Sequence, residues 1–232
     1  MDVSATAGRS AVVTSIATPI DAGPEHPYLR FAAKHGFTVA APSVARHLEL
    51  PVDTDRLSDL FDESRRRWDD RYTVSTHLGA VPEERQQPLC ELMGMLEAEA
   101  PTGAVELEPM RITPADYRQD IANATQRGSL RVTTLAVERR SGRLAGYTEI
   151  TGPSRGGRRA HQGGTLVLAD HRGHSLGIAL KTANIREFAL LTDRPCLLTT
   201  TNADMNAPMV AINDLLGFRA VESRPLLQRL NT

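Results

Sequence analysis

The chain has 232 residues, of which 41% are hydrophobic and 24% are charged, and its formal net charge is -1. This profile is typical of a globular protein with one large domain or two small ones, and it argues against nucleic acid and membrane as partners. Cys90 and Cys196 stand alone in their stretches, so we expect no disulfide framework, no metal site and a cytoplasmic location.

The first fifty residues are predicted to hold a fragment of a sheet. An apolar, β-rich run at Ala11 to Ala17 precedes a short helix, and Gly36 and Phe37 open a second strand. Two strands do not close a sheet, so this part of the chain needs a partner.

Two helices are predicted between residues 52 and 105. Apolar residues recur at helical spacing from Asp53 to Tyr72. Pro82 suits the first position of the second helix, in which Pro88 should cause a kink or a restart. We therefore expect residues 52–105 to form a helical linker.

A helix and a β-hairpin are predicted from residue 113 onward. Thr113 and Asp116 have the spacing of an N-cap and an acidic residue in the first turn. The apolar period then changes to two, with residues 141–142 as a turn between strands at 130–138 and 144–151.

The C-terminal part is predicted to alternate strands with helices. In order it contains a glycine-rich connection at 152–164, a strand at 165–169, a helix at 175–191, a strand at 196–201, a helix from about Pro208 to Gly217, and a β segment at 218–230. This order indicates an α+β fold, a mixed α/β layer in which helices flank a central, mostly antiparallel twisted sheet.

The segment from Thr165 to Leu191 is predicted to bind an anion. A loop that feeds a helix N-terminus leaves backbone N–H groups unpaired, and the helix dipole adds partial positive charge there. Gly173 and Gly177 would let the backbone approach a diphosphate. Further donors could come from Arg172, His174 and Lys181. The glycine spacings of a P-loop and of a Rossmann fold are absent.

Residues 172–177 resemble the pyrophosphate-binding motif of the GNAT acetyltransferases, Gln/Arg-x-x-Gly-x-Gly/Ala. The six places are filled by Arg172, Gly173, His174, Ser175, Leu176 and Gly177. Ser175 replaces the first glycine, which is tolerable if its φ is helical. The resemblance implies the GNAT fold and acetyl-CoA as co-substrate, with the loop through Ile178 holding the diphosphate. It also implies that the main chain of the preceding strand binds the pantetheine, through Thr165, Leu166, Val167 and Leu168.

A second stretch, from Asn202 to Phe218, is similar to the other signature of that family, a helix that an Asn opens and Leu-Gly-Phe ends. The resemblance implies CoA-binding roles for Asn202 and Asn206, although Asn206 is also placed to cap the helix. Many members carry in this helix a tyrosine that protonates the departing thiolate. Here its place is taken by Asn213, so protonation would fall to water or another group.

The general base is predicted to be Glu149, which by analogy with the family would lie near the acceptor end of the cleft. A strand residue that faces solvent is an equally simple interpretation of Glu149. The alternatives are His161, His171 and His174. For His171 and His174 a phosphate-side or structural role is favoured, and no carboxylate or cysteine completes a metal site.

Residues 10–51 also resemble the end of a GNAT domain, in which Gly36 and Phe37 repeat the later Gly-Phe pair. The chain thus resembles a tandem GNAT protein with a degenerate remnant at 1–51, the helical linker at 52–105 and a complete catalytic domain at 106–232. The exposed edge of a strand at Ala11 to Ala17 predicts a homodimer.

We therefore expect an N-acetyltransferase that moves an acetyl group from acetyl-CoA to a primary amine of a small molecule by direct transfer. The alternative is a catalytically degenerate module that binds CoA thioesters for regulation or assembly. The departures from the motif at Ser175 and Asn213 leave this alternative open.

Overall fold

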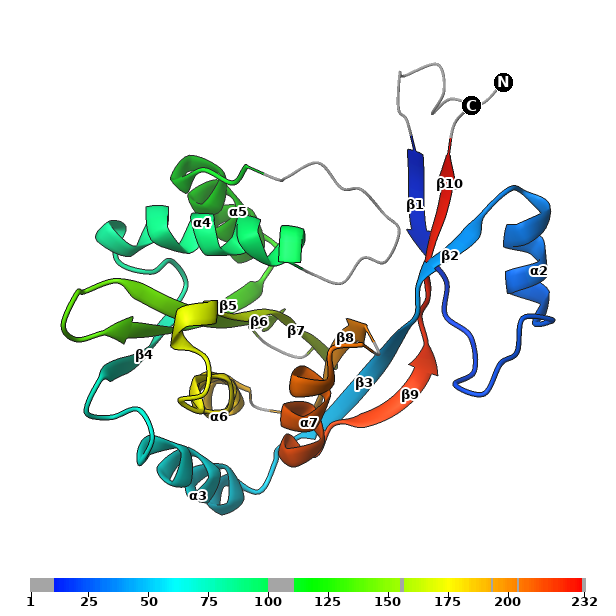
Figure 1. The fold of residues 1–232 in the computed structure, drawn as a ribbon. Helices are drawn as coiled ribbons and strands as arrows, with labels where there is room; N and C mark the ends of the chain where they lie inside the picture. The colour runs from blue at the N-terminus through cyan, green and yellow to red at the C-terminus, as the bar shows by residue number, and fades with distance from the viewer. Residues whose placement is uncertain (1–10, 100–110, 155–156, 193, 204, 231–232) are drawn as a thin grey trace.

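The computed structural model describes residues 11–99, 111–154, 157–192, 194–203 and 205–230. They form a seven-stranded sheet in the order β4-β5-β6-β7-β8-β3-β9 and a three-stranded sheet in the order β1-β10-β2. Figure 1 shows the smaller sheet beside the larger one, with the chain passing from β2 in one sheet to β3 in the other.

The larger sheet is mixed but mostly antiparallel. Its strands, in sheet order, are β4 (Tyr72–Leu78), β5 (Ser129–Glu138), β6 (Leu144–Pro153), β7 (Arg159–Val167), β8 (Cys196–Ala203), β3 (Ser43–Leu50) and β9 (Arg219–Ser223). Of the pairings in the described part of the chain, that of β7 with β8 is parallel and the others are antiparallel. The predicted α+β class is confirmed.

The smaller sheet combines strands from the two ends of the chain. It contains β1 (Ala11–Ser15), β10 (Leu226–Leu230) and β2 (Thr38–Ala41), and α2 (Pro27–Lys34) lies over it. In each sheet a strand from the other half of the chain is inserted: β10 between β1 and β2, and β3 between β8 and β9. Both sheets therefore depend on both halves of the chain.

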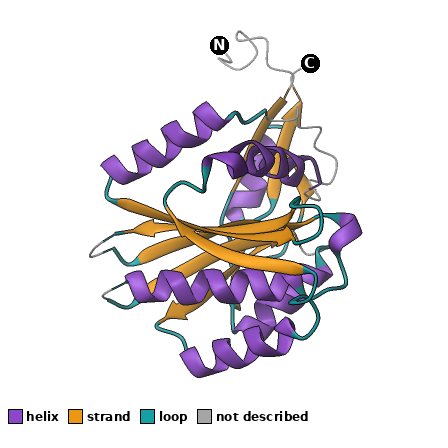
Figure 2. Ribbon diagram, turned by 90° about the vertical axis from the view of Figure 1, so that its left-hand side faces the viewer, coloured by secondary structure: helices purple, strands orange, loops and turns teal. Residues whose placement is uncertain are grey.

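Helices cover the two faces of the larger sheet, as Figures 1 and 2 show. On one face lie α4 (Glu83–Glu99) and α5 (Pro114–Gln126), and on the other lie α6 (Leu176–Leu191), α3 (Thr54–Arg65) and α7 (Ala207–Leu216). Local signals start and end these helices. Asp53 caps α3, Thr113 and Asp116 form the predicted capping box of α5, and Gly217 ends α7 with a φ of 89°.

The period-two pattern of the central strands builds a core on each face of this sheet. Leu135 and Tyr147 pack with α4 and α5, whereas Val132 and Ile150 pack with Phe188 of α6. Burial of each such side chain stabilises the fold by about 1.5–3 kcal/mol. None of the helices among the described residues is long and apolar enough to cross a membrane.

Three predictions about elements are wrong. The stretch 52–105 is not wholly helical, because β4 forms within it and pairs with β5. The strand β7 begins at Arg159, inside the predicted glycine-rich connection. The segment 218–230 divides into β9 and β10, which lie in different sheets. Pro88 lies inside α4, which continues through it without a restart.

These differences bear on the predicted division of the chain. The larger sheet contains strands from all three of the predicted parts, since β3, β4 and β5 belong to 1–51, 52–105 and 106–232 respectively. The predicted boundary at residue 106 lies outside the described residues. The seven-stranded sheet is therefore larger than the segment that was expected to form it.

Candidate functional site

The larger sheet opens between β7 and β8. These strands pair over three positions, Arg159–His161 with Leu197–Thr199. Beyond that, β7 continues to Val167 and β8 to Ala203 without pairing to each other. Backbone N–H and C=O groups along the open inner edges can therefore bind an extended ligand.

The predicted pantetheine-binding residues fall mainly on this open stretch. Thr165, Leu166 and Val167 belong to the part of β7 that has left β8. Leu168 lies past the end of the strand, and its N–H donates to the carbonyl of Ala145 at 2.9 Å. Leu168 is therefore already bonded within the protein through its N–H.

The helix α6 begins at the open end of the gap without a side-chain cap. Its N-cap residue Ser175 has a φ of 57° and a ψ of 20°, so its conformation is left-handed and the condition that its φ be helical is not met. The Ser175 hydroxyl makes no capping bond, and no acidic residue lies in the first turn. Asp53, Thr113 and Asn206, by contrast, cap α3, α5 and α7. The start of α6 thus keeps N–H groups available to an anion.

Glycine is required at positions 173 and 177 for two different structural reasons. Gly173 has a φ of 83°, and a Cβ there would meet no atom within 4 Å, so the backbone conformation and not the space requires glycine. A Cβ on Gly177 would lie 2.8 Å from Cδ1 of Ile212. Gly177 therefore allows α6 to pack closely against α7.

The side chains of the loop are held by neighbouring strands. Arg172 Nε donates to the carbonyl of Val167 at 3.0 Å. His171 Nδ1 lies 2.9 Å from the hydroxyl of Tyr72, and His174 Nε2 lies 3.2 Å from Nη1 of Arg71. Both histidines are thus tied to the start of β4, in the kind of structural role that the sequence favoured for them.

Lys181 does not lie at the mouth of the loop, so the prediction that it supplies a donor there is wrong. Its side chain is buried, with 1% of the residue exposed, and Nζ donates to Asn213 Oδ1 at 2.7 Å. Asn213 Nδ2 in turn donates to Asn202 Oδ1 at 2.6 Å. Burial lowers the pKa of Lys181 to about 7.

Asn206 accepts a hydrogen bond from the N–H of Met209 at 3.3 Å and caps α7.

Glu149 lies in the middle of β6, two residues beyond Tyr147 and therefore on the face that α4 and α5 cover. Its side chain is 19% exposed, and Oε2 lies 3.8 Å from Nη1 of Arg131. Arg131 also pairs with Asp120 of α5. Burial raises the pKa of Glu149, and the charge of Arg131 opposes this rise.

The surroundings of Glu149 leave hydrogen-bonding capacity unused. In the described part of the chain, Glu149 Oε2 and Arg131 Nε are buried and have no hydrogen-bond partner. On the next strand, a Cβ at Gly163 would lie 3.0 Å from Glu149 Oε1, so a glycine at this position leaves room for the carboxylate. Buried polar atoms are normally paired, which favours a polar molecule at this place.

Sequence reasoning missed Arg131, Gly163 and Tyr72 as parts of the site. Arg131 could have been predicted, because the hairpin turn at 141–142 sets the register that places Thr133 opposite Glu149. Arg131 lies two residues from Thr133 and therefore on the same face of the sheet as Glu149. The partnership of Tyr72 with His171 spans 99 residues and has no local signal. The remaining candidate base, His161, lies at the closed end of the gap opposite Thr199.

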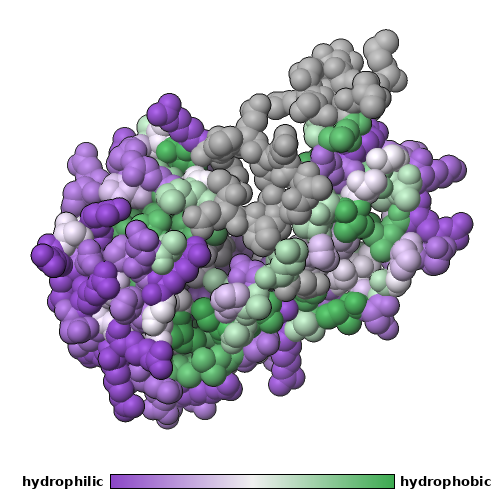
Figure 3. Space-filling model, in the orientation of Figure 1, coloured by the Kyte–Doolittle hydropathy of each residue, from purple (hydrophilic) through white to green (hydrophobic). Residues whose placement is uncertain are grey.

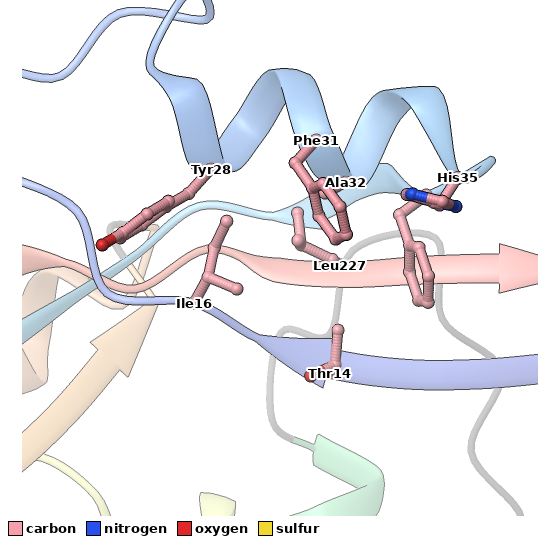
Figure 4. A pocket seen from close by; sticks show the side chains of 8 residues that line it. Thr14, Ile16, Tyr28, Phe31, Ala32, His35 and Leu227 are labelled. Atoms are coloured by element: carbon pink, nitrogen blue, oxygen red, sulfur yellow. The ribbon is translucent and has the colours of Figure 1, made fainter.

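Two further features of the described residues concern possible binding sites. No group of three His, Cys, Asp or Glu side chains that could hold a metal occurs among them. An apolar pocket of about 260 Å³ lies between α2 and the smaller sheet, lined by residues such as Ile16, Phe31 and Leu227 (Figure 4). It does not include any residue of the gap or of the α6 loop.

Solved structures with a similar fold include acetyltransferases. A tandem GNAT protein from the clavulanic acid biosynthesis pathway has a TM-score of 0.70 and 25% identity, over 99% of this chain and 66% of that one. A GCN5-related N-acetyltransferase from Sphaerobacter thermophilus has a TM-score of 0.59 and 14% identity, over 95% of this chain and 60% of that one. A putative GNAT-family acetyltransferase from Novosphingobium aromaticivorans has a TM-score of 0.52 and 17% identity, over 96% of this chain and 75% of that one.

The chain spans 66% and 60% of the lengths of the first two of these proteins. No protein-family model and no curated protein matches it.

Proposed function

We propose that this chain, which has the fold of the GNAT acetyltransferases, moves an acetyl group from acetyl-CoA to a primary amine of a small molecule. The observation that carries the proposal is the uncapped N-terminus of α6 at the mouth of the gap between β7 and β8. A ligand with a diphosphate at one end and a thin amide-bearing arm fits both features, since helix N–H groups bind the anion and open strand edges bind the arm.

The residues that would hold acetyl-CoA follow from this placement. The loop from Arg172 to Ile178 supplies backbone N–H groups for the diphosphate. The arm would run along Thr165 to Val167 on one side of the gap, with Asn202 and Asn206 on the other. Because the two cysteines are free and acetyl-CoA is a cytoplasmic metabolite, we place this activity in the cytoplasm.

Glu149 is the proposed general base for direct transfer. The acceptor enters as an ammonium and must lose a proton before its nitrogen can attack the thioester carbonyl. A buried carboxylate with a raised pKa can take that proton near neutral pH, and Arg131 holds it in position. The unpaired Glu149 Oε2 and Arg131 Nε provide polar atoms that the acceptor amine or a bridging water could engage.

A module that binds CoA thioesters without catalysis is the second candidate, and one observation favours it. Asn213 stands at the place of the family's tyrosine acid, and it is fully buried and bonded to both Lys181 and Asn202. Binding of acetyl-CoA would then occur without turnover.

The first experiment tests the CoA site by thermal unfolding with acetyl-CoA. A ligand that binds only the native state at 100 times its Kd stabilises that state by about 2.7 kcal/mol, so the unfolding midpoint should rise. Arg172→Glu should reduce the rise, because it puts a negative charge beside the diphosphate. Arg127→Glu is the matched control, because it makes the same charge change far from the proposed site. Arg127 is exposed next to the start of β5, whereas His171, which precedes Arg172, lies near Glu138 at the other end of that strand. An equal rise in all three proteins would contradict the placement of the site.

The second experiment separates catalysis from binding alone. Acetyl-CoA is mixed with the protein and a panel of small primary amines, and release of the free thiol is followed. Thiol release that depends on both protein and amine supports the transferase. Binding of acetyl-CoA without release by any member of a broad panel would favour the binding module.

A further inference from the structure

The buried amine of Lys181 has no anionic partner among the described residues. Its Nζ donates to Asn213 Oδ1 at 2.7 Å and lies 5.1 Å from the centre of the Phe218 ring. An ammonium has three N–H donors, and the structure shows one of them used. No carboxylate of the described chain pairs with Lys181, and burial is the cause of its lowered pKa.

This arrangement is costly for a purely structural contact. A buried ammonium without a counter-ion is strongly disfavoured, and an apolar side chain such as Met would fill the same space at no such cost. The groups that the structure shows beside Nζ are the Asn213 amide and the Phe218 ring, and neither titrates; the Asn202 amide, which accepts from Asn213, does not titrate either. Lys181 is therefore a lone proton-carrying group in an apolar setting, which is characteristic of functional lysines.

The position of this lysine relates it to the gap in the sheet. Asn213 connects Lys181 of α6 to Asn202, which lies in the part of β8 beyond Thr199 that no longer pairs with β7. Glu149 lies on the opposite face of the same sheet, under α4 and α5. A thioester lying in the gap would thus have a carboxylate on one face of the sheet and an amine on the other.

We infer, on the basis of the proposed function, that Lys181 is the acid that protonates the departing CoA sulfur and that Asn213 orients its ammonium group. The acceptor nitrogen forms a bond to the thioester carbonyl carbon, the C–S bond breaks, and its electron pair stays on sulfur. A proton then passes from Lys181 Nζ to the sulfur and gives the free thiol. The flexible four-carbon stem lets Nζ turn from Asn213 toward the gap.

The protons balance over one turnover. The ammonium form of the acceptor loses two protons when it becomes an amide. Glu149 accepts the first and returns it to solvent. The second replaces the proton that Lys181 gives to sulfur, so that both side chains regain their starting states and one proton is released.

The inference can be tested without knowing the acceptor, because a group that protonates the thiolate must also take the proton from the thiol. The whole protein is saturated with CoA, and ionisation of its thiol is followed by ultraviolet absorbance as the pH rises. Desulfo-CoA, which keeps every contact except the sulfur, provides the blank. We expect the thiol of bound CoA to ionise at least about one pH unit below that of free CoA, as thiols beside a basic group do.

Two variants assign the effect to the residue. Lys181→Met should bind desulfo-CoA as the wild type does and lose the shift in thiol ionisation. Arg186→Met removes a cation from the exposed side of the same helix and should keep the shift.

The outcomes are distinct for the two proposals. If desulfo-CoA fails to bind, the proposed function is wrong and this inference falls with it. If desulfo-CoA binds and the thiol of CoA ionises on the wild-type protein as it does in water, the inference alone is overturned. A shift that persists in Lys181→Met also overturns it. The wild-type titration decides the matter even if Lys181→Met does not fold.

Discussion

Two titratable side chains, the partly buried Glu149 and the buried Lys181, lie on opposite faces of the larger sheet, and their pKa values move in opposite directions. Burial raises the pKa of the Glu149 carboxyl and lowers that of the Lys181 amine to about 7. The cause is the same, because a medium of low polarity disfavours whichever form is charged. The result brings a carboxylate and an amine closer in proton affinity than they are in water, which is what acid–base catalysis near neutral pH needs.

Glu149→Gln should lower turnover with an accepted amine by about two to four orders of magnitude, the usual worth of a positioned proton transfer. The amide cannot take a proton, whereas the residues proposed to hold acetyl-CoA lie on β7, β8 and the loop before α6 and are unchanged. The thermal shift with acetyl-CoA should therefore be unchanged. In the wild type, activity should fall as the pH drops through the raised pKa of Glu149, above the range of an ordinary carboxyl.

The matched control for Glu149→Gln is Asp120→Asn, since Asp120 is the other carboxylate on Arg131. It should retain most of the activity, because Arg131 still holds Glu149. Full turnover in Glu149→Gln would move the role of base to His161 or to solvent.

Lys181 should give the protein a characteristic dependence of stability on pH. Its pKa is about 7 in the folded state against 10.5 for an ordinary lysine. Between these values the unfolded chain binds more protons than the folded one, so the free energy of unfolding rises with pH, by about 1.4 kcal/mol per unit at most.

Urea unfolding of the wild type and Lys181→Met at a series of pH values measures this effect. The variant should be the more stable protein at pH 7, and its advantage should shrink as the pH rises toward 10. A constant difference across that range would show that Lys181 keeps its proton in the folded protein.

At the scale of the elements, the start of α6 combines two unusual features. It lacks a side-chain cap, and the chain enters it through a serine in the left-handed conformation. The backbone turns sharply there because β7 must end at the sheet and α6 must return across its face. A glycine adopts this conformation at no steric cost, whereas a Cβ adds strain. The strain at Ser175 is therefore local, and no hydroxyl bond to the helix offsets it.

Ser175→Gly should stabilise the protein by about 0.5–1 kcal/mol, since relief of the strain outweighs the added freedom of the unfolded chain. Equilibrium unfolding in urea measures the change. Ser175→Ala is the control, because it keeps the Cβ and removes only the hydroxyl, and it should leave stability nearly unchanged. A glycine variant no more stable than the alanine variant would show that the surrounding loop imposes no strain at this residue.

At the scale of the whole molecule, strand exchange joins the smaller sheet to the larger one. The strands β3 and β10 each lie in the sheet of the other half of the chain. Among the described residues, β1 and β2 are the edge strands of the smaller sheet. Figure 3 shows hydrophobic residues among hydrophilic ones over β1, β10 and α2. The exposed large hydrophobic residues here are Tyr28 and Phe31 of α2, Val39 of β2 and Leu230 of β10, and we define the apolar surface by these four.

We predict that the protein is a homodimer through this apolar surface and the edge strand β1. Paired edges and covered apolar patches are the normal state of such features. Light scattering coupled to size exclusion should give a mass near twice the 25.3 kDa of one chain. A monomeric mass at micromolar concentration would contradict the prediction.

Two charge substitutions place the interface. Phe31 is 66% exposed on α2, so Phe31→Glu should fold and shift the protein toward the monomer. Leu190 is 78% exposed on α6, and Leu190→Glu should leave the dimer intact. If both variants dimerise equally well, the contact lies elsewhere.

The sequence by itself determined those features whose signals are local. The capping box at Thr113 and Asp116, the hairpin turn at 141–142 and the glycine that ends α7 each specify a few neighbouring residues. The order of elements after residue 113 and the loop before α6 could be predicted for this reason. A strand such as β4 was missed, because it is an edge strand that is stabilised by pairing with β5, distant in the sequence.

Only the tertiary structure decided which distant residues meet. The bond between Lys181 and Asn213 spans 32 positions and that between Tyr72 and His171 spans 99. The exchange of β3 and β10 depends on which strand edges are free once the rest of the sheet has formed. Such contacts follow from burial and from competition between alternative partners, which no short stretch of sequence contains. For this reason the sequence predicted an anion-binding loop before α6, whereas the burial of Lys181 and the left-handed conformation of Ser175 were visible only in the tertiary structure.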